Sequence, residues 1–134
     1  MSIELVVVTP EGEAFSGQAE EVVLPGVEGE FGVLEAHERF LSALDHGCME
    51  IRTGDASQFS AVSDGFAEVG AERVVVMVDS LIPKGEIDVA AARVALEEAT
   101  TELERIGAAD DPSKAEFENA RARAQAQLDV AERA

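Results

Sequence analysis

The spacing of apolar residues changes once along this chain of 134 residues, at Pro83-Lys84-Gly85-Glu86. Before that point the apolar residues form short β-branched runs separated by glycine, proline and polar turns, which is typical of many short antiparallel strands. After it, apolar residues recur at intervals of three and four, which predicts amphipathic helices. We therefore expect an α+β chain, with an N-terminal antiparallel β-sandwich over residues 1–86 and a C-terminal antiparallel two-helix hairpin over residues 87–134.

Nine strands are predicted in the first part of the chain. Their bounds are Ile3 to Thr9, Glu13 to Ser16, Ala19 to Leu24, Gly32 to Leu34, Phe40 to Leu44, Cys48 to Arg52, Gln58 to Val62, Phe66 to Val69 and Arg73 to Asp79. The run from Val74 to Val78 is apolar at every position, so we expect a central strand with both faces covered. Turn-forming residues separate the runs at Pro10-Glu11-Gly12, Pro25-Gly26, Thr53-Gly54-Asp55 and Gly70-Ala71-Glu72.

The second part of the chain predicts two helices. In the first, Asp88 is the expected N-cap and Gly107 the expected stop. Its apolar stripe consists of Val89, Ala92, Leu96, Ala99, Leu103 and Ile106. The second helix begins near Asp111-Pro112, or at Ser113, whose spacing to Glu116 fits a capping box.

The apolar stripe of the second helix is mostly alanine. Its members are Phe117, Ala120, Ala124, Leu128 and Ala131. Alanine-lined helices pack closely but bury little apolar area. The hairpin should therefore depend on docking to another surface, which makes it a candidate movable element.

Charge and cysteine content exclude several classes of protein. A formal charge of −18 argues against nucleic acid and anionic lipid as direct partners. Cys48 is the only cysteine, so an internal disulfide or a cysteine-rich metal site is impossible, and a cytosolic compartment is expected. The longest aliphatic run, Val74 to Val78, is far shorter than the ~20 residues that span a bilayer. We expect neither a signal peptide nor direct transmembrane insertion.

The sequence contains no motif for catalysis. A nucleophile elbow, a phosphate loop and a His-Glu-Xaa-Xaa-His zinc motif are all missing. A metal site built from the two histidines, His37 and His46, would need carboxylates brought in by the fold. We therefore expect no catalytic residues, no metal and no cofactor.

The last predicted helix carries four of the ten basic residues, Lys114, Arg121, Arg123 and Arg133. They form either a solvated face or a surface for an acidic partner.

The segment from Val22 to Leu34 has the most distinctive pattern. It places three glycines and a proline around two carboxylates, between two apolar runs. This composition describes a tight exposed loop whose backbone can approach a partner closely, and a plain turn fits it equally well.

The motifs that follow this segment extend the pattern. They are His37 and Leu41, then Gly47 with Met49-Glu50-Ile51-Arg52, then Ala61 to Val69, and then Arg73 to Val76. In this order they resemble the epsilon subunits of bacterial F-type ATP synthases, called delta in mitochondria. The resemblance covers about residues 3–88, and the hairpin follows where that family has one. The family usually has a proline-containing turn before His37, whereas this chain has Glu35-Ala36. This departure bears on the shape of the local turn and not on the resemblance as a whole.

The resemblance implies a non-catalytic rotor subunit of the central stalk, which couples ion flow through the c-ring to ATP synthesis. Such a subunit is peripheral, at the cytoplasmic face of the cell inner membrane. The residues carried over to the loop that would contact the c-ring are Glu28, Gly29, Glu30, Phe31 and Gly32. His37 would lie near the gamma subunit.

The family resemblance also implies a mobile hairpin. It would either fold against the sandwich or extend along gamma towards the alpha and beta subunits, where it inhibits ATP hydrolysis. The basic residues of the inhibitory helix would be Lys114, Arg121 and Arg123.

Some members of that family bind ATP on the hairpin through Ile or Leu, then Asp, two variable residues, Arg and Ala. This chain has Ile87-Asp88-Val89-Ala90-Ala91-Ala92, so Ala91 occupies the arginine position. Arg93 lies two positions later, about 200° around the helix. We expect weak ATP binding at Ile87, Asp88 and Arg93, with Asp88 acting instead as the N-cap.

Two other functions compete with the one that this resemblance implies. One is a stand-alone β-sandwich binding module whose hairpin dimerises, which would not form a stable complex with gamma. The other is a small acidic hydrolase, which would require turnover by the purified chain.

Overall fold

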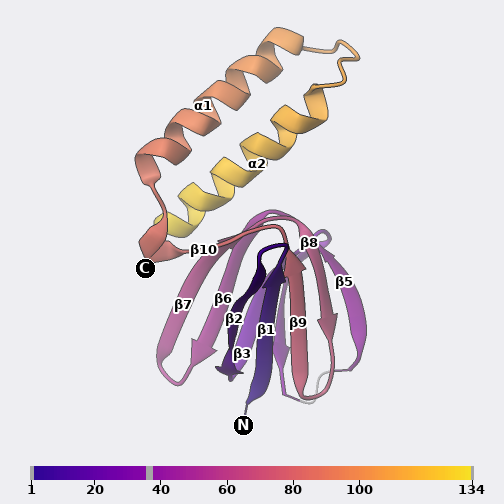
Figure 1. The fold of residues 1–134 in the computed structure, drawn as a ribbon, viewed down its shortest axis with the longest axis vertical. Helices are drawn as coiled ribbons and strands as arrows, with labels where there is room; N and C mark the ends of the chain where they lie inside the picture. Colours follow the sequence, from indigo (N-terminus) through magenta and orange to yellow (C-terminus); the bar gives the residue numbers. More distant parts are fainter. Residues whose placement is uncertain (1, 36–37, 134) are drawn as a thin grey trace.

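A computed structural model describes residues 2–35 and 38–133. Within these residues ten strands are followed by a short 3-10 helix and two α-helices (Figure 1). The strands are β1 (Ile3–Thr9), β2 (Gly12–Ala19), β3 (Glu21–Gly26), β4 (Gly29–Leu34), β5 (Phe40–Leu44), β6 (Gly47–Thr53), β7 (Ala56–Val62), β8 (Gly65–Val69), β9 (Arg73–Val78) and β10 (Leu81–Pro83). The helices are η1 (Lys84–Glu86), α1 (Val89–Ile106) and α2 (Lys114–Ala131).

The strands form a sandwich that turns back on itself at β3. The strand order is β10-β7-β6-β3-β5-β8-β9-β1-β2, and β4 pairs with the free side of β3. β3 pairs with β6 through residues 21–23 but meets β5 only where Gly26 lies opposite Leu44. Aliphatic side chains such as Leu5, Leu24 and Met49 fill the space between the layers and are fully buried. The expected sandwich with a C-terminal helical hairpin is confirmed.

One strand pair is parallel, so the expectation of a fully antiparallel sandwich is wrong in this detail. β1 runs parallel to β9, with Leu5 opposite Val74 and Val7 opposite Val76. A parallel pair needs a long connection between its strands. Here the other strands of the sandwich provide that connection, which short-range turn signals could not show.

β9 is central, as predicted, because β8 and β1 flank it. Its faces are not both covered, which corrects the second half of that prediction. Val74, Val76 and Val78 are at most 4% exposed, whereas Met77 is 40% exposed and Val75 is half-buried. Only one face of a sandwich strand meets the core, so the apolar residues on its other face require a separate explanation.

Local signals placed most strands well but misplaced one turn. Pro25-Gly26 lies within β3, and the turn to β4 consists of Val27 and Glu28. β10 was not predicted. It is only three residues long, pairs with β7 and forms the edge of the sheet, and its last residue, Pro83, fits an edge position because proline cannot donate a ladder hydrogen bond.

The first helix agrees with its sequence signals. Asp88 Oδ1 accepts a hydrogen bond from Ala91 N at 3.0 Å, and Gly107 ends α1 with φ of 59°. The start of α2 differs. Ser113 has helical backbone angles and makes no capping hydrogen bond, so the predicted capping box is absent. Instead, the backbone N and Oγ of Ser113 both donate to Asp111 Oδ1, and these hydrogen bonds lower the pKa of Asp111.

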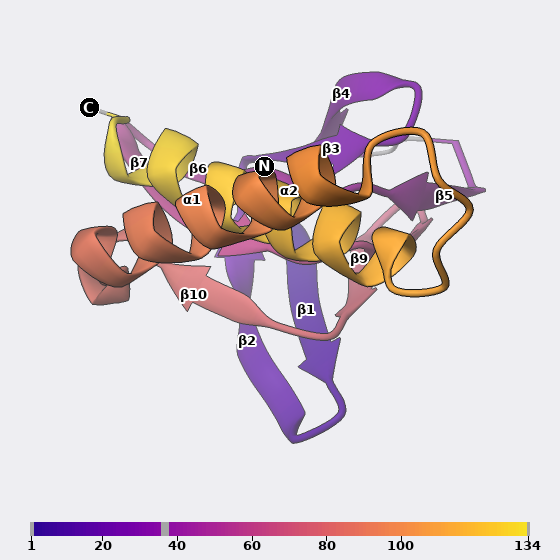
Figure 2. The ribbon, with the colours of Figure 1, turned by 90° about the horizontal axis from the view of Figure 1, so that it is seen from above.

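Helix α2 packs on two sides. It lies against α1 along one side, and its C-terminal part packs on β6, β7 and η1 (Figures 1 and 2). The predicted alanine stripe includes Phe117 and Ala120, which line the groove shared with α1. A second stripe, Asn119, Ala126 and Val130, recurs at intervals of seven and four on the opposite side. Ala126 and Val130 are buried, whereas Asn119 is exposed. The predicted stripe looked thin because α2 divides its buried side chains between two faces.

Candidate partner-binding surfaces

The loop predicted to contact a partner is the tip of the β3–β4 hairpin. Gly26 pairs with Gly29, and Val27 and Glu28 form the turn between them. Gly29 has φ of 129°, which an L side chain rarely adopts, and it leaves the turn without strain. Val27 is 59% exposed, and Glu28 and Glu30 are also exposed. The tip therefore presents two carboxylates beside one apolar side chain.

Four of the five residues assigned to this loop are in fact in a strand, which corrects the loop boundary, and the first of them, Gly29, begins that strand. Glu30, Phe31 and Gly32 belong to β4 and pair with β3. Phe31 points inward, packs against the core and meets Phe40 edge to face, with ring centroids 5.5 Å apart. A Cβ on Gly26 would lie 2.9 Å from the Phe31 ring, so glycine is required for this packing.

The hairpin tip is fixed to the neighbouring strand. Val27 N donates to Ala43 O at 3.1 Å, and Asp45 N donates to Pro25 O at 2.8 Å. These bonds hold the two exposed carboxylates on a rigid support rather than on a loose loop. A rigid support lowers the entropic cost of binding a partner.

An apolar row crosses the outer face of the layer formed by β5, β8, β9 and β1. Ala43 on β5 lies opposite Phe66 on β8, Phe66 lies opposite Met77 on β9, and Met77 lies opposite Val8 on β1. Phe66, Met77 and Val8 are 52%, 40% and 37% exposed. We call these four residues the apolar row. Four aligned apolar side chains, three of them exposed and Ala43 half-buried, mark an interaction surface in a chain this acidic.

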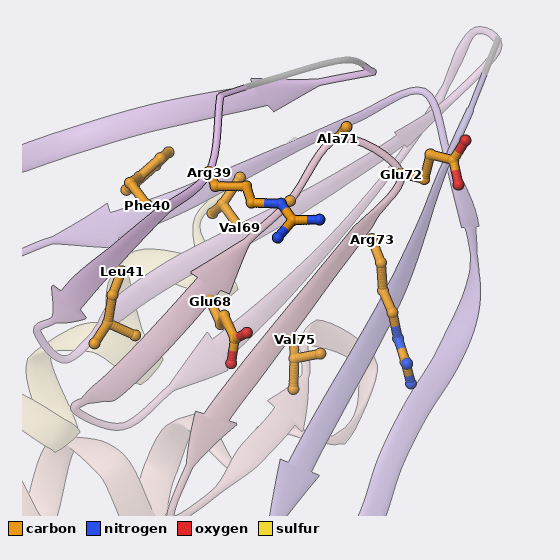
Figure 3. A pocket seen from close by; sticks show the side chains of 10 residues that line it. Arg39, Phe40, Leu41, Glu68, Val69, Ala71, Glu72, Arg73 and Val75 are labelled. Carbon is orange, nitrogen blue, oxygen red and sulfur yellow. The ribbon is translucent and has the colours of Figure 1, made fainter.

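A shallow pocket lies beside the apolar row. Leu41, Glu68 and Val75 stand side by side on the same outer face of β5, β8 and β9 (Figure 3). Leu41 is 66% exposed. Arg39 and Arg73 line the far end, and Arg73 Nε lies 3.1 Å from Glu4 Oε1. The surface is thus apolar near the β7–β8 turn and charged at the opposite end of the strands.

A second hydrophobic cluster joins the hairpin to the sandwich. Its buried members are Cys48 on β6, Ala61 on β7 and Val130 on α2, with Phe59 and Ile87 packed around them. We call Cys48, Phe59, Ala61 and Ile87 the docking site of α2. Burial raises the pKa of the Cys48 thiol. The thiol is therefore protonated and unreactive while α2 is in place.

His46 is the residue that sequence reasoning undervalued. It was considered only as a metal ligand, yet its side chain is 4% exposed and lies between the sandwich and α2. Its Nε2 is hydrogen-bonded to Asn119 Oδ1 of α2 and lies 3.5 Å from Asp64 Oδ1. The spacing of Asn119 from Val130 on α2 is the one sequence signal that could have identified this contact.

The residues nearest to the nucleotide motif have other contacts. Asp88 caps α1, and Ile87 packs in the cluster at the docking site. Arg93 is exposed on α1. Lys114 Nζ donates to Gly107 O at 3.2 Å across the connection between the helices.

Arg121 and Arg123 are exposed on α2. His37, expected near gamma, lies outside the described residues. Across residues 2–35 and 38–133 there is no group of three or more His, Cys, Asp or Glu side chains that could hold a metal ion. No helix in the described part of the chain has the length and apolarity needed to cross a bilayer.

Comparison with known proteins places this geometry in a family. Residues 2–84 match the β-sandwich domain of the ATP synthase delta/epsilon chain. An ATP synthase epsilon chain from Anaeromyxobacter sp. (strain K) is 41% identical over 133 residues, covering 99% of this chain and 100% of the relative. The epsilon chain of Helicobacter pylori (strain Shi470) is 41% identical over 106 residues, covering 75% of this chain and 86% of the relative.

Solved structures agree with the sequence comparisons. A chain in the Euglena gracilis mitochondrial ATP synthase (OSCP/F1/c-ring) superposes with a TM-score of 0.82 at 25% identity, covering 98% of this chain and 82% of that one. A chain in the central stalk and c-ring of the Tetrahymena thermophila enzyme shares the fold, with a TM-score of 0.60, 15% identity and coverage of 97% and 93%. The sandwich, the hairpin and the 41% identity over 99% of this chain lead to one conclusion: this chain belongs to the ATP synthase delta/epsilon family.

Proposed function

We propose that this chain is the non-catalytic epsilon subunit in the central stalk of an F-type ATP synthase. It couples ion flow through the c-ring to ATP synthesis in the catalytic head, and its hairpin restrains ATP hydrolysis. It acts as a peripheral component at the cytoplasmic face of the cell inner membrane. The apolar row carries this proposal, because an exposed apolar surface on so acidic a chain requires a permanent protein partner.

We assign the apolar row to the gamma subunit. A rotor subunit must stay attached through many rotations, which favours an apolar interface over exposed ion pairs. The row runs across four strands of one rigid sheet, so gamma would meet a preformed surface. The adjacent charges of Arg39, Glu68 and Arg73 would form the polar edge of that interface.

The β3–β4 tip is assigned to the c-ring. Glu28 and Glu30 are exposed on a hairpin that hydrogen bonds fix to β5. Two carboxylates suit a basic partner surface such as the polar loops of the c-ring in this family. Torque transmission needs a stiff contact, and the half-buried Phe31 behind the tip, packed against the core, provides stiffness.

The hairpin is assigned the regulatory role. In the folded position, the C-terminal part of α2 packs on β6 and β7. An extended position would bring Arg121 and Arg123 towards the alpha and beta subunits. A small apolar contact between hairpin and sandwich suits an element that must occupy two positions.

Co-purification with the gamma subunit tests this assignment. Phe66→Glu should abolish a stable complex, because it places a charge in the centre of the apolar row. Leu34→Glu is the matched control, since Leu34 is 56% exposed on β4, outside the row. If both variants bind gamma as well as the unmodified chain, the gamma surface lies elsewhere. If the unmodified chain fails to bind gamma, the central-stalk assignment itself is wrong.

A further inference from the structure

The burial of Cys48 depends on the hairpin. Side chains alternate along β6, and Met49 and Ile51 point into the core. Cys48 therefore points outward, and yet it is only 8% exposed. Val130 of α2 covers it, in a cluster separate from the main core.

The beginning and the end of the hairpin meet at the docking site. Ile87, which precedes α1, packs in the same cluster as Val130, near the end of α2. Lys84 Nζ of η1 donates to Arg133 O. The Arg133 guanidinium lies 5.8 Å from the centre of the Phe59 ring, within the range of a cation–π contact.

We propose that residues 130–133 hold the hairpin in its folded position, so that its hinge and its point of attachment are one place. Residues 84–87 serve as the hinge and also as part of the surface on which the end of α2 rests. Breaking the contact of Val130 and Arg133 frees both ends of the hairpin at once. Release also uncovers the Cys48 thiol.

The geometry favours release at this end. Nearer the start of α2, the helix contacts the sandwich through the polar pair of Asn119 and His46. A polar pair is readily replaced by water once the surface opens, whereas a buried valine is not. The apolar contact at residues 130–133 therefore decides whether the hairpin stays folded.

Labelling of Cys48 in the full chain with a thiol-reactive disulfide dye measures release directly, because the chain has one cysteine. We expect slow labelling of the unmodified chain. Val130→Ala should label at least tenfold faster, with an unchanged midpoint of urea unfolding of the sandwich by circular dichroism. Arg133→Ala should label about threefold faster, as expected for the loss of a cation–π contact of about 0.5–1 kcal/mol. Val94→Ala is the matched control, because it removes the same methyl groups from a side chain 54% exposed on α1.

Several outcomes would overturn the proposal. One is a Val130→Ala variant that labels at the rate of the unmodified chain. A second is an equal acceleration in Val94→Ala. A third is a labelling rate that rises only in urea concentrations that unfold the sandwich, since Cys48 would then be protected by the sandwich itself.

A variant on the sandwich side links release to regulation, and this step rests on the proposed function. Phe59→Ala leaves both helices unchanged but removes the ring under Arg133. In the assembled enzyme it should accelerate Cys48 labelling and inhibit ATP hydrolysis more strongly than the unmodified subunit does. Faster labelling without stronger inhibition would confirm the attachment point and contradict the inhibitory role. Unchanged labelling would contradict the attachment point alone.

Discussion

The sandwich and the hairpin differ in how much apolar surface holds each in place. Among the described residues, the main core cluster contains sixteen buried residues, whereas the cluster between hairpin and sandwich contains three. Burial of each aliphatic side chain contributes about 1.5–3 kcal/mol. The sandwich therefore sets the stability of the fold, while a contact worth a few kcal/mol sets the position of the hairpin. A few kcal/mol is the range in which a partner or ligand can shift an equilibrium between two conformations.

The largest expected effect tests the sandwich side of this comparison. Leu24→Ala should lower the free energy of unfolding by about 2–5 kcal/mol, because the Leu24 side chain is fully buried in the core and its truncation leaves a cavity there. Urea denaturation followed by circular dichroism measures this, since the chain has no Trp or Tyr. A comparable loss in Val130→Ala would contradict the separation of the two clusters.

Removal of the hairpin should have a smaller effect on stability. A chain ending at Glu86 should still unfold cooperatively, at a cost of about 1–3 kcal/mol for the lost cover of Cys48 and Ala61. It should bind gamma but no longer restrain ATP hydrolysis. Loss of gamma binding in this shortened chain would place that interface on the hairpin.

A surface ion pair between two residues of β6 should contribute still less to the stability of the fold. Arg52 Nε donates to Glu50 Oε2 at 2.9 Å, and this bond is the main reason that the pKa of Glu50 lies below its ordinary value. A lowered pKa stabilises the folded state above the unfolded-state value of about 4.3, and the benefit is lost as the pH falls through the folded-state pKa.

Arg52→Leu should therefore lower the free energy of unfolding only slightly at pH 7, because the pair is exposed to solvent, and by less still at pH 3. Urea denaturation at the two pH values measures this difference. Arg121→Leu, on the exposed surface of α2, is the control. An equal loss at both pH values would show that Arg52 acts through packing rather than charge.

Glu30→Lys should leave stability within about 0.5 kcal/mol, because the side chain is exposed. Its effect should appear only in the assembly, as weaker attachment of the catalytic head to the c-ring through like-charge repulsion. Ion-coupled ATP synthesis in membranes carrying the variant is the measurement. Unchanged synthesis would mean that the tip is only a turn.

The smallest expected effect is the binding of ATP to the hairpin, which should be weak. We expect a dissociation constant weaker than about 10 μM, or less than ~7 kcal/mol of binding, by titration calorimetry with the full chain. Asp88 is engaged as an N-cap and Ala91 supplies no guanidinium. Ala91→Arg should strengthen binding. No gain would mean that α2 lacks the remaining donors as well, and tight binding by the unmodified chain would contradict the prediction.

The parts of the fold that local chemistry determines were predicted from the sequence. Apolar runs located nine of the ten strands found in the described part of the chain, and Asp88 and Gly107 marked both ends of α1. The parallel pairing of β1 and β9 was not predictable in this way, because it joins residues about seventy positions apart. Periodicity reports a buried face but not which of several distant strands will cover it.

The candidate surfaces were predicted less completely for the same reason. The acidic tip was found from its glycines and carboxylates, although its boundary was placed too far along β4. The apolar row was missed, because Ala43, Phe66, Met77 and Val8 come from four strands and meet only through their register. The docking site was missed because Val130 was not recognised as part of a second face on α2.

The pairing of β1 with β9 also fixes the order in which the chain can fold during synthesis. The first strand has its antiparallel neighbour β2 early, but its other edge stays unpaired until residues 73–78 have left the ribosome. Contacts between residues so distant in sequence form slowly, and unpaired strand edges promote aggregation. The sandwich should therefore close late, and the hairpin should find its docking site only after the sandwich has closed.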